Sequence, residues 1–127
     1  MTKGINSRRK GAVGERAAAQ FLCSLGFAAE RSARNGVKGA GDLIVRDLPN
    51  VHIEVKRLER MDIGTVCLAD ACDQARAASG LGRRWAVLWR PNGKSWRLTF
   101  RAHAPAMNVT VEEAAIPAAL WWLNSKE

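Results

Sequence analysis

The sequence predicts a single α/β domain over residues 1–127, with a central mixed β-sheet flanked by helices. Apolar residues recur at helical spacing near both ends, and segments of alternating apolar and polar residues lie between them. Clusters of Gly, Pro, Asn and Asp separate these segments. The expected order is α-β-β-β-α-β-β-α. A chain of 127 residues with 47% apolar residues can build one hydrophobic core.

The first predicted element is a helix from Ser7 to Leu25. Ser7 is a good N-cap after a loose arm over residues 1–6, and Gly26 is suited to the position just past the helix end. Apolar residues at helical spacing predict a buried stripe of Val13, Ala17, Phe21 and Leu25. A first strand is expected over residues 27–34.

A β-hairpin is predicted next, with strands at residues 42–45 and 51–56. The intervening residues 46–50 contain Asp, Pro and Asn, which form turns. Because strand side chains alternate between faces, Val51, Ile53 and Val55 share the apolar face. Glu54 and Lys56 share the other face, and the hairpin brings Asp42 beside them.

Two carboxylates and an ammonium at one point indicate a divalent-metal site that acts on phosphate esters. Mg²⁺ prefers oxygen ligands and usually takes one or two protein carboxylates. Asp42 and Glu54 can supply these, with the Val55 carbonyl as a third ligand, and Mn²⁺ is expected to substitute. Lys56 can orient a water or stabilise charge on the phosphate. An isolated Glu-x-Lys pair is more often the solvated face of a surface hairpin.

The second half of the chain predicts a helix over residues 67–79, two strands and a last helix. The strands, at residues 85–90 and 95–100, are joined by a hairpin turn at 91–94. Each carries aromatic residues on one face, which fill core or an interface more often than they stack on unpaired bases. The spacing from Thr110 to Glu113 fits a capping box, and Pro117 starts the last helix. Of Trp121 and Trp122, one could lie in the core and the other in a dimer contact.

The charge balance predicts a polyanionic partner. Twenty Lys and Arg against twelve Asp and Glu give a net charge of +8. The sequence has no apolar run long enough to cross a membrane and no signal-peptide or lipidation motif, so a cytoplasmic location is expected. The glycine-rich loop before Asp42 would let a phosphate backbone approach closely. The expected phosphate contacts are Arg8, Arg9, Lys10, Arg31, Arg34, Lys38, Arg57 and Arg60.

The cysteines and histidines add little to this interpretation. Cys23, Cys67 and Cys72 form no C-x-x-C pair, so buried reduced thiols are expected. His52 lies on the Glu54 face and could approach the metal, but a partly exposed strand histidine is the simpler interpretation. His103 shows no catalytic pattern.

The residues from Arg9 to Lys56 resemble the PD-(D/E)XK nuclease superfamily, and within it the archaeal-type Holliday-junction resolvases. The matching parts are "RRKGAVGERAAAQFLCSLGFAAERSARNG", "GDLIV" and "IEVK". The resemblance implies a restriction-endonuclease-like fold and assigns the acidic residues and lysine of the family to Glu15, Asp42, Glu54 and Lys56. Glu15 would organise metal or water, and Ser32 and Gln74 would be auxiliary. Gly41 stands where many members have Pro.

This resemblance implies a Mg²⁺-dependent endonuclease for branched DNA that works as a homodimer, because a four-way junction needs two symmetric cuts. Cleavage of flaps, ends, single strands or duplex sites is the alternative activity. A non-catalytic DNA-binding module on the same scaffold is another class, although clustered carboxylates would repel phosphate. A metal-free RNA endonuclease would want a tyrosine, and the chain has none.

Overall fold

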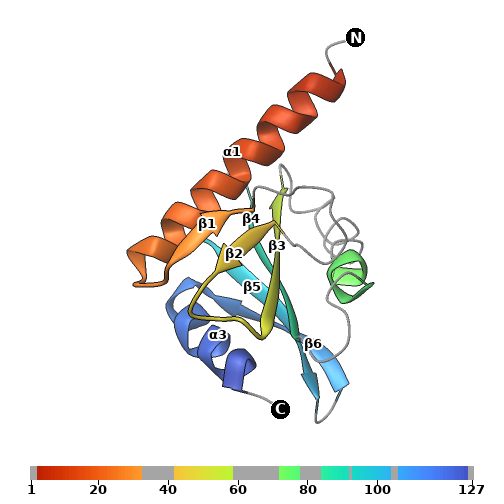
Figure 1. Ribbon diagram of the computed structural model, residues 1–127. Helices are drawn as coiled ribbons and strands as arrows, with labels where there is room; N and C mark the ends of the chain where they lie inside the picture. Colours follow the sequence, from red (N-terminus) through yellow and green to blue (C-terminus); the bar gives the residue numbers. More distant parts are fainter. Residues whose placement is uncertain are drawn as a thin grey trace.

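The computed structural model describes residues 3–32, 42–58, 72–77, 84–91, 93–103 and 106–125, with backbone only at 3–13, 57–58, 102–103 and 106. A six-stranded sheet in the order β1-β2-β3-β4-β5-β6 forms the centre (Figure 1). Neighbouring strands are antiparallel except β3 and β4, which are parallel. The elements are α1 (Lys3–Ser24), β1 (Ala29–Arg31), β2 (Leu43–Val45), β3 (Val51–Leu58), a helical segment at 72–77, β4 (Arg84–Pro91), β5 (Arg97–His103), β6 (Ala106–Glu112), the 3-10 turn η1 (Glu113–Ala115) and α3 (Ile116–Ser125). The predicted α/β class with a mixed sheet and flanking helices is confirmed.

Helix α1 begins at Lys3, one turn before the predicted start at Ser7, because residues 3–6 continue the helix. Its C-terminal end is a Schellman motif. The N–H of Phe27 donates to the carbonyl of Leu22 at 3.1 Å, and the N–H of Gly26 donates to Cys23 at 3.0 Å. Gly26 has φ +96°, a left-handed conformation that favours glycine. The predicted end of the helix is therefore confirmed.

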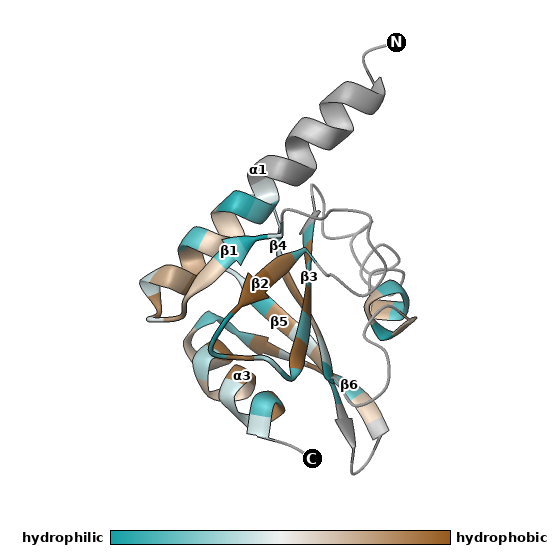
Figure 2. Cartoon of the chain, in the orientation of Figure 1, coloured by the Kyte–Doolittle hydropathy of each residue, from teal (hydrophilic) through white to brown (hydrophobic). Residues whose placement is uncertain are grey.

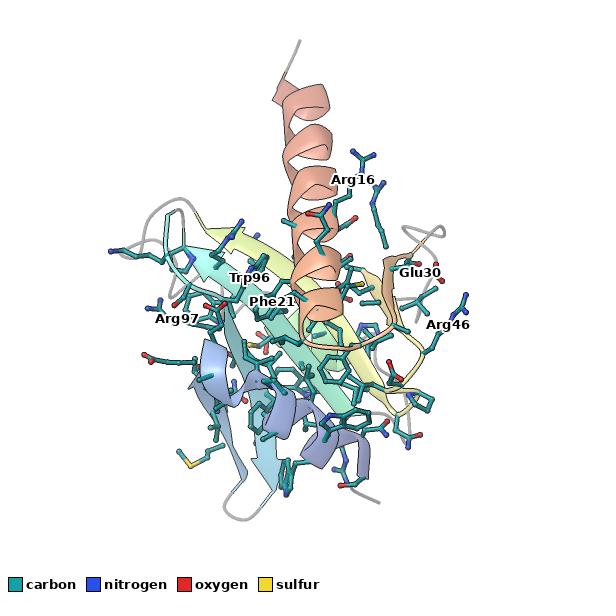
Figure 3. The ribbon with its side chains drawn as sticks, turned by 90° about the vertical axis from the view of Figure 1, so that its left-hand side faces the viewer. Arg16, Phe21, Glu30, Arg46, Trp96 and Arg97 are labelled. Atoms are coloured by element: carbon teal, nitrogen blue, oxygen red, sulfur yellow. The ribbon has the colours of Figure 1, made fainter. Side chains whose placement is uncertain are left out.

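The buried face of α1 differs from the predicted stripe. Ala18 and Leu22 are fully buried, and Glu15 lies on the same face one turn earlier. Ala17, Phe21 and Leu25 are only partly buried beside this face. The face of the helix that packs on the sheet therefore differs from the predicted face. The small side chain of Ala18 lets the helix backbone approach the sheet, and Phe21 packs beside this contact against Trp96. Their rings stack with centroids 5.6 Å apart (Figure 3).

Two separate clusters of buried residues lie on opposite faces of the sheet. The larger joins α1 and α3 to the strands and includes Leu22, Ile53, Leu98 and Leu120. The smaller lies under the 72–77 segment and consists of Cys72, Ala75, Trp85, Val87 and Trp89. The apolar strand segments show as brown in the middle of the molecule (Figure 2). The predicted apolar faces of residues 85–90 and 95–100 are confirmed. Trp85, Trp89 and Trp96 are buried in the core, so their rings are not exposed for stacking on bases.

Strand β6 was not predicted, and the capping box at Thr110 was wrong. Residues 106–112 pair with β5 along its whole length. The N-cap of η1 is Glu112, which makes no side-chain capping hydrogen bond. Thr110 instead shares a 2.7 Å hydrogen bond with Thr99 across the two strands. The alternation of Met107, Val109 and Val111 carried the strand signal.

Helix α3 begins at Ile116, so the predicted helix at Pro117 is confirmed. The prediction that one of Trp121 and Trp122 lies in the core is wrong. Ile116, Leu120 and Leu123 are buried, while Trp121 and Trp122 are 50% and 38% exposed. Neither tryptophan lies in the core. Each covers a core ring from outside, Trp121 on Phe27 and Trp122 on Phe100. None of the described helices is long and apolar enough to span a membrane.

Candidate active site

The hairpin of β2 and β3 brings Asp42 and Glu54 together. Leu43 pairs with Ile53 in an antiparallel register, and the N–H of Asp42 donates to the carbonyl of Ile53 at 3.1 Å. The N–H of Val55 then donates to Oδ2 of Asp42 at 2.8 Å. Glu54 lies between these two backbone contacts, and its carboxyl group hydrogen bonds with that of Asp42. The predicted convergence of the two carboxylates is therefore present.

The pKa values of the two carboxyl groups shift in opposite directions. The pKa of Asp42 is raised from 3.8 to about 7, first by burial and then by its hydrogen bond and charge repulsion with Glu54. The negative charge of Glu15 adds to this, and the Val55 N–H opposes it. For Glu54, burial opposes ionisation, but hydrogen bonds with His52 and Asp42 outweigh burial and lower the pKa. Burial and the neighbouring Glu54 therefore delay the ionisation of Asp42 until the pH reaches about 7.

His52 lies two residues before Glu54 on the same face of β3. Its Nε2 is 2.7 Å from Oε1 of Glu54, and the side chain is 0% exposed. The prediction of a partly exposed histidine was wrong. Alternation along the strand placed His52 on the same face as Glu54, but this face is buried at His52. Trp85 pairs with His52 across the parallel strands and belongs to the cluster under the segment.

Lys56 extends the same face of β3 beyond Glu54. Its partner in the parallel register is Trp89, and its side chain is partly exposed. Trp89 is fixed by a 2.9 Å hydrogen bond from its Nε1 to Oγ1 of Thr99. The spacing therefore puts Lys56 on the same face of β3 as Glu54, beside the buried Trp89 of β4.

Glu15 is oriented by Arg31. Nε of Arg31 donates to Oε1 of Glu15 at 2.8 Å, which joins α1 to β1. The Glu15 side chain is only 12% exposed. Its charge still acts on Asp42, since it is one of the causes that raise the pKa of that group. Arg31 was predicted as a phosphate contact, and in this arrangement it pairs with a carboxylate.

The two auxiliary residues differ in placement. The backbone N–H of Ser32 donates to the carbonyl of Asp42 at 3.0 Å, and Ser32 is 3% exposed. The backbone of Ser32 is thus paired with that of Asp42, and its auxiliary role stays a prediction. Gln74 is exposed on the 72–77 segment, whose Cys72 and Ala75 face the sheet. Its auxiliary role stays a prediction.

The predicted phosphate contacts are only partly within the described residues. Arg8, Arg9 and Lys10 lie on the N-terminal half of α1 and Arg57 on β3, with backbone described. Arg34, Lys38 and Arg60 lie outside the described residues. Elsewhere, Arg90 lies over Trp96 and Arg97 over Trp89, at 4.4 and 5.4 Å from the ring centroids. Nη2 of Arg46 lies 3.8 Å from Oε1 of Glu30, on the opposite side of the view in Figure 3 from Arg97.

The donor set suits a metal that needs few protein ligands. Within the described ranges, no group of three or more His, Cys, Asp or Glu side chains could hold a metal ion. Asp42 and Glu54 offer two neighbouring carboxyl groups, while the carboxylate of Glu15 is paired with Arg31. This matches the small protein contribution that Mg²⁺ usually accepts. A cation bound at this position would lower the raised pKa of Asp42.

The described cysteines make no metal site. Cys72 is buried, and burial raises the pKa of its thiol to about 11, so it is an inert thiol as expected. Cys23 is exposed, contrary to the prediction, because it lies on the outer side of α1. Its Sγ donates to the carbonyl of Ala29. Cys67 lies outside the described residues.

Comparison with known proteins gives one solved structure of note. The chain is similar to Hjc, a Holliday junction resolvase from the archaeal hyperthermophile Archaeoglobus fulgidus. The sequences are 25% identical, the TM-score is 0.49, and the match covers 85% of this chain and 93% of that one. No protein-family model matches the chain, and no curated protein matches it.

Proposed function

We propose that the protein is a divalent-metal-dependent endonuclease that hydrolyses phosphodiester bonds in DNA. The observation that carries this proposal is the pair of hydrogen-bonded carboxyl groups, Asp42 and Glu54, followed by Lys56 on the same strand face. A protein that only binds DNA gains from cations and loses from clustered carboxylates, which repel phosphate. The pair therefore favours catalysis over simple binding.

Asp42 and Glu54 would hold the metal, with the backbone carbonyl of Val55 as a third ligand. The bound ion, Mg²⁺ or Mn²⁺, would supply an acidic water and polarise the phosphoryl oxygen. Asp42 would have to be ionised to act as a ligand. Asp42 is already fixed by the 2.8 Å hydrogen bond from Val55, so this ligand needs little reorganisation.

The remaining residues of the site act on the phosphate and its surroundings. The Lys56 ammonium stabilises negative charge that builds on the phosphate or orients the attacking water. Glu15, held by Arg31, keeps a negative charge near Asp42 and so assists cation binding. The net charge of +8 and the basic residues at the start of α1 would hold the DNA backbone.

We infer further that the substrate is branched DNA and that the protein works as a homodimer. The sequence resemblance over Arg9 to Lys56 supports the substrate class. One site of this kind cuts one strand, so resolution of a four-way junction calls for two sites related by a two-fold axis. The exposed Trp121, Trp122 and Met107 on α3 and β6 supply apolar surface that a second copy could bury.

The proposal is tested by offering the protein four-way junction, flap, single-stranded and linear duplex DNA side by side. Each substrate is incubated with Mg²⁺, Mn²⁺, Ca²⁺ or EDTA. Paired symmetric cuts in the junction, and no cuts in EDTA, are expected. Sedimentation at the same protein concentration should show a dimer. A monomer that prefers ends or single strands would reject the resolvase function and leave the broader nuclease, while cleavage in EDTA would reject the metal mechanism.

A further inference from the structure

His52 combines complete burial with a polar contact to only one group. Nε2 lies 2.7 Å from Oε1 of Glu54, and the side chain is 0% exposed. Among the described side chains, Nδ1 of His52 is the buried nitrogen or oxygen atom that has no hydrogen-bond partner. Trp85, the partner of His52 in the parallel register, is a buried apolar residue of β4. A purely structural residue at this position would be better served by an aliphatic side chain.

The contact with Glu54 fixes the tautomer of His52. Nε2 has an acceptor at hydrogen-bond distance in Oε1 of Glu54, whereas Nδ1 has no partner, so the ring hydrogen is placed on Nε2. In the neutral ring Nδ1 is then a bare acceptor. This tautomer leaves only a lone pair without a partner, whereas a hydrogen on Nδ1 would be a buried donor without an acceptor. The imidazole is thus aimed at one oxygen of Glu54.

We propose that His52 is a positioning residue that orients the Glu54 carboxylate for a divalent cation. The inference rests on the proposed metal-dependent function, because it assigns a role towards the same metal. A ligand carboxylate that is free to rotate must be ordered when the ion binds, and the hydrogen bond from Nε2 provides that order beforehand. Removing such an outer partner typically weakens metal affinity or activity about 10–100-fold.

The test is a direct measurement of Mn²⁺ binding without DNA, by calorimetry or by the electron paramagnetic resonance of free Mn²⁺. His52→Leu should raise the Kd for Mn²⁺ about 10–100-fold relative to the unaltered protein. Leu98→Ala is the matched control, since Leu98 is equally buried but lies on β5 in the other cluster. It should unfold at lower denaturant and leave the Kd for Mn²⁺ unchanged. The Mn²⁺ concentration that gives half-maximal DNA cleavage should follow the Kd in each variant.

Two amide variants, His52→Gln and His52→Asn, test whether Nε2 is the atom that orients Glu54. They also provide the test if His52→Leu does not fold. The amide nitrogen of Gln lies as many bonds from Cβ as Nε2 of His, whereas that of Asn corresponds to Nδ1. His52→Gln should therefore retain a Kd for Mn²⁺ within a few-fold of the unaltered protein, and His52→Asn should resemble His52→Leu. Equal rescue by both amides, or rescue by neither, would overturn the assignment.

The outcomes separate this inference from the function on which it rests. If the unaltered protein binds no Mn²⁺ and cleaves no DNA, the metal-dependent function itself is wrong. If it binds and cleaves, but His52→Leu binds Mn²⁺ equally well, only the positioning role is wrong. A loss of Mn²⁺ affinity in Leu98→Ala as large as that in His52→Leu would also overturn the role, because the effect would then follow from stability alone.

Discussion

The backbone N–H of Val55 holds the side chain of Asp42 across the β2–β3 hairpin, at 2.8 Å from Oδ2. This contact links the two halves of the site, because Val55 directly follows Glu54. It stabilises the charged form of Asp42, but burial and the neighbouring carboxyl of Glu54 outweigh it. Backbone contacts therefore hold Asp42 beside Glu54, and burial together with the Glu54 carboxyl raises the pKa of Asp42 to about 7.

Asp42→Asn and Glu54→Gln should each abolish metal-dependent cleavage without unfolding the protein. Each change removes a ligand charge but keeps the shape of the side chain and one acceptor oxygen, so Val55 can still donate to residue 42. Cleavage of a labelled DNA substrate and circular dichroism measure the two effects. Asp47→Asn is a suitable control, because Asp47 lies in the hairpin turn and accepts from the N–H of Ala28. Full cleavage by either ligand variant would exclude this metal site.

The raised pKa of Asp42 predicts how stability changes with pH in EDTA. A carboxyl group whose pKa is higher in the folded state favours folding below its unfolded pKa of 3.8, and that contribution is lost as the pH rises to about 7. Asp42→Asn should thus raise the free energy of unfolding at pH 8 by about 1–3 kcal/mol, less than the full shift because the group is partly exposed. At pH 4 the difference should be small.

Denaturant unfolding at several pH values checks this expectation. Glu54, whose pKa is lowered, contributes in the opposite sense, because its stabilising effect is lost as the pH falls. The quantity to follow is therefore the difference in free energy of unfolding between Asp42→Asn and the unaltered protein. A saturating divalent cation should remove the difference at pH 8 or reverse its sign. A difference that is the same at pH 4 and pH 8 would contradict the raised pKa.

Lys56→Ala should lower the rate of cleavage by about two to four decades, the scale of losing one positioned catalytic group. DNA affinity in Ca²⁺ should change little, because Lys56 is one of twenty Lys and Arg residues. Lys94→Ala is the matched control, since Lys94 is exposed in the turn between β4 and β5. It should leave the rate unchanged. Equal losses of rate and affinity in Lys56→Ala would reduce this residue to a phosphate contact.

Glu15→Gln and Arg31→Ala should act as one unit. Their side chains are joined at 2.8 Å, so removing either charge frees the other from its orientation. Each change should lower the rate about tenfold, and the double variant should be little worse than either alone. If Arg31 is instead a phosphate contact, Arg31→Ala will weaken DNA binding in Ca²⁺ and the two effects on rate will multiply.

The sequence correctly predicted the elements that depend on residues close together in the chain. The Schellman end at Gly26 and the hairpin of β2 and β3 follow from glycine conformation, turn residues and strand alternation. Strand β6 was missed because it is an edge strand whose alternation is short and whose Thr110 also fits a helix cap. The face of α1 was misjudged because apolar periodicity favoured Phe21, whereas close packing against the sheet selects Ala18 and Leu22.

The candidate site shows the same division. Strand alternation and turn chemistry predicted the meeting of Asp42 and Glu54, since both depend on residues near each other in sequence. The burial of His52 depends on tertiary packing around β3, whose parallel neighbour β4 follows it in the chain. The pairing of Arg31 with Glu15 depends on how α1 docks on β1, and a sequence gives no direct measure of docking. Tertiary packing therefore decides what local patterns leave open.

DNA binding should depend steeply on salt, because phosphate contacts release condensed counterions. With Ca²⁺ present to prevent cleavage, the logarithm of the affinity should fall against the logarithm of the salt concentration with a slope of about −5 or steeper, if about six phosphates are neutralised. Charge reversal of the cluster Arg8, Arg9 and Lys10 on α1 should make the slope shallower and weaken every DNA substrate alike. Charge reversal at Arg46, which lies beside Glu30 and away from α1's N-terminal half, should have a smaller effect. If the cluster variant weakens the four-way junction alone and spares duplex DNA, α1 reads the branch itself and the general phosphate-binding role is wrong.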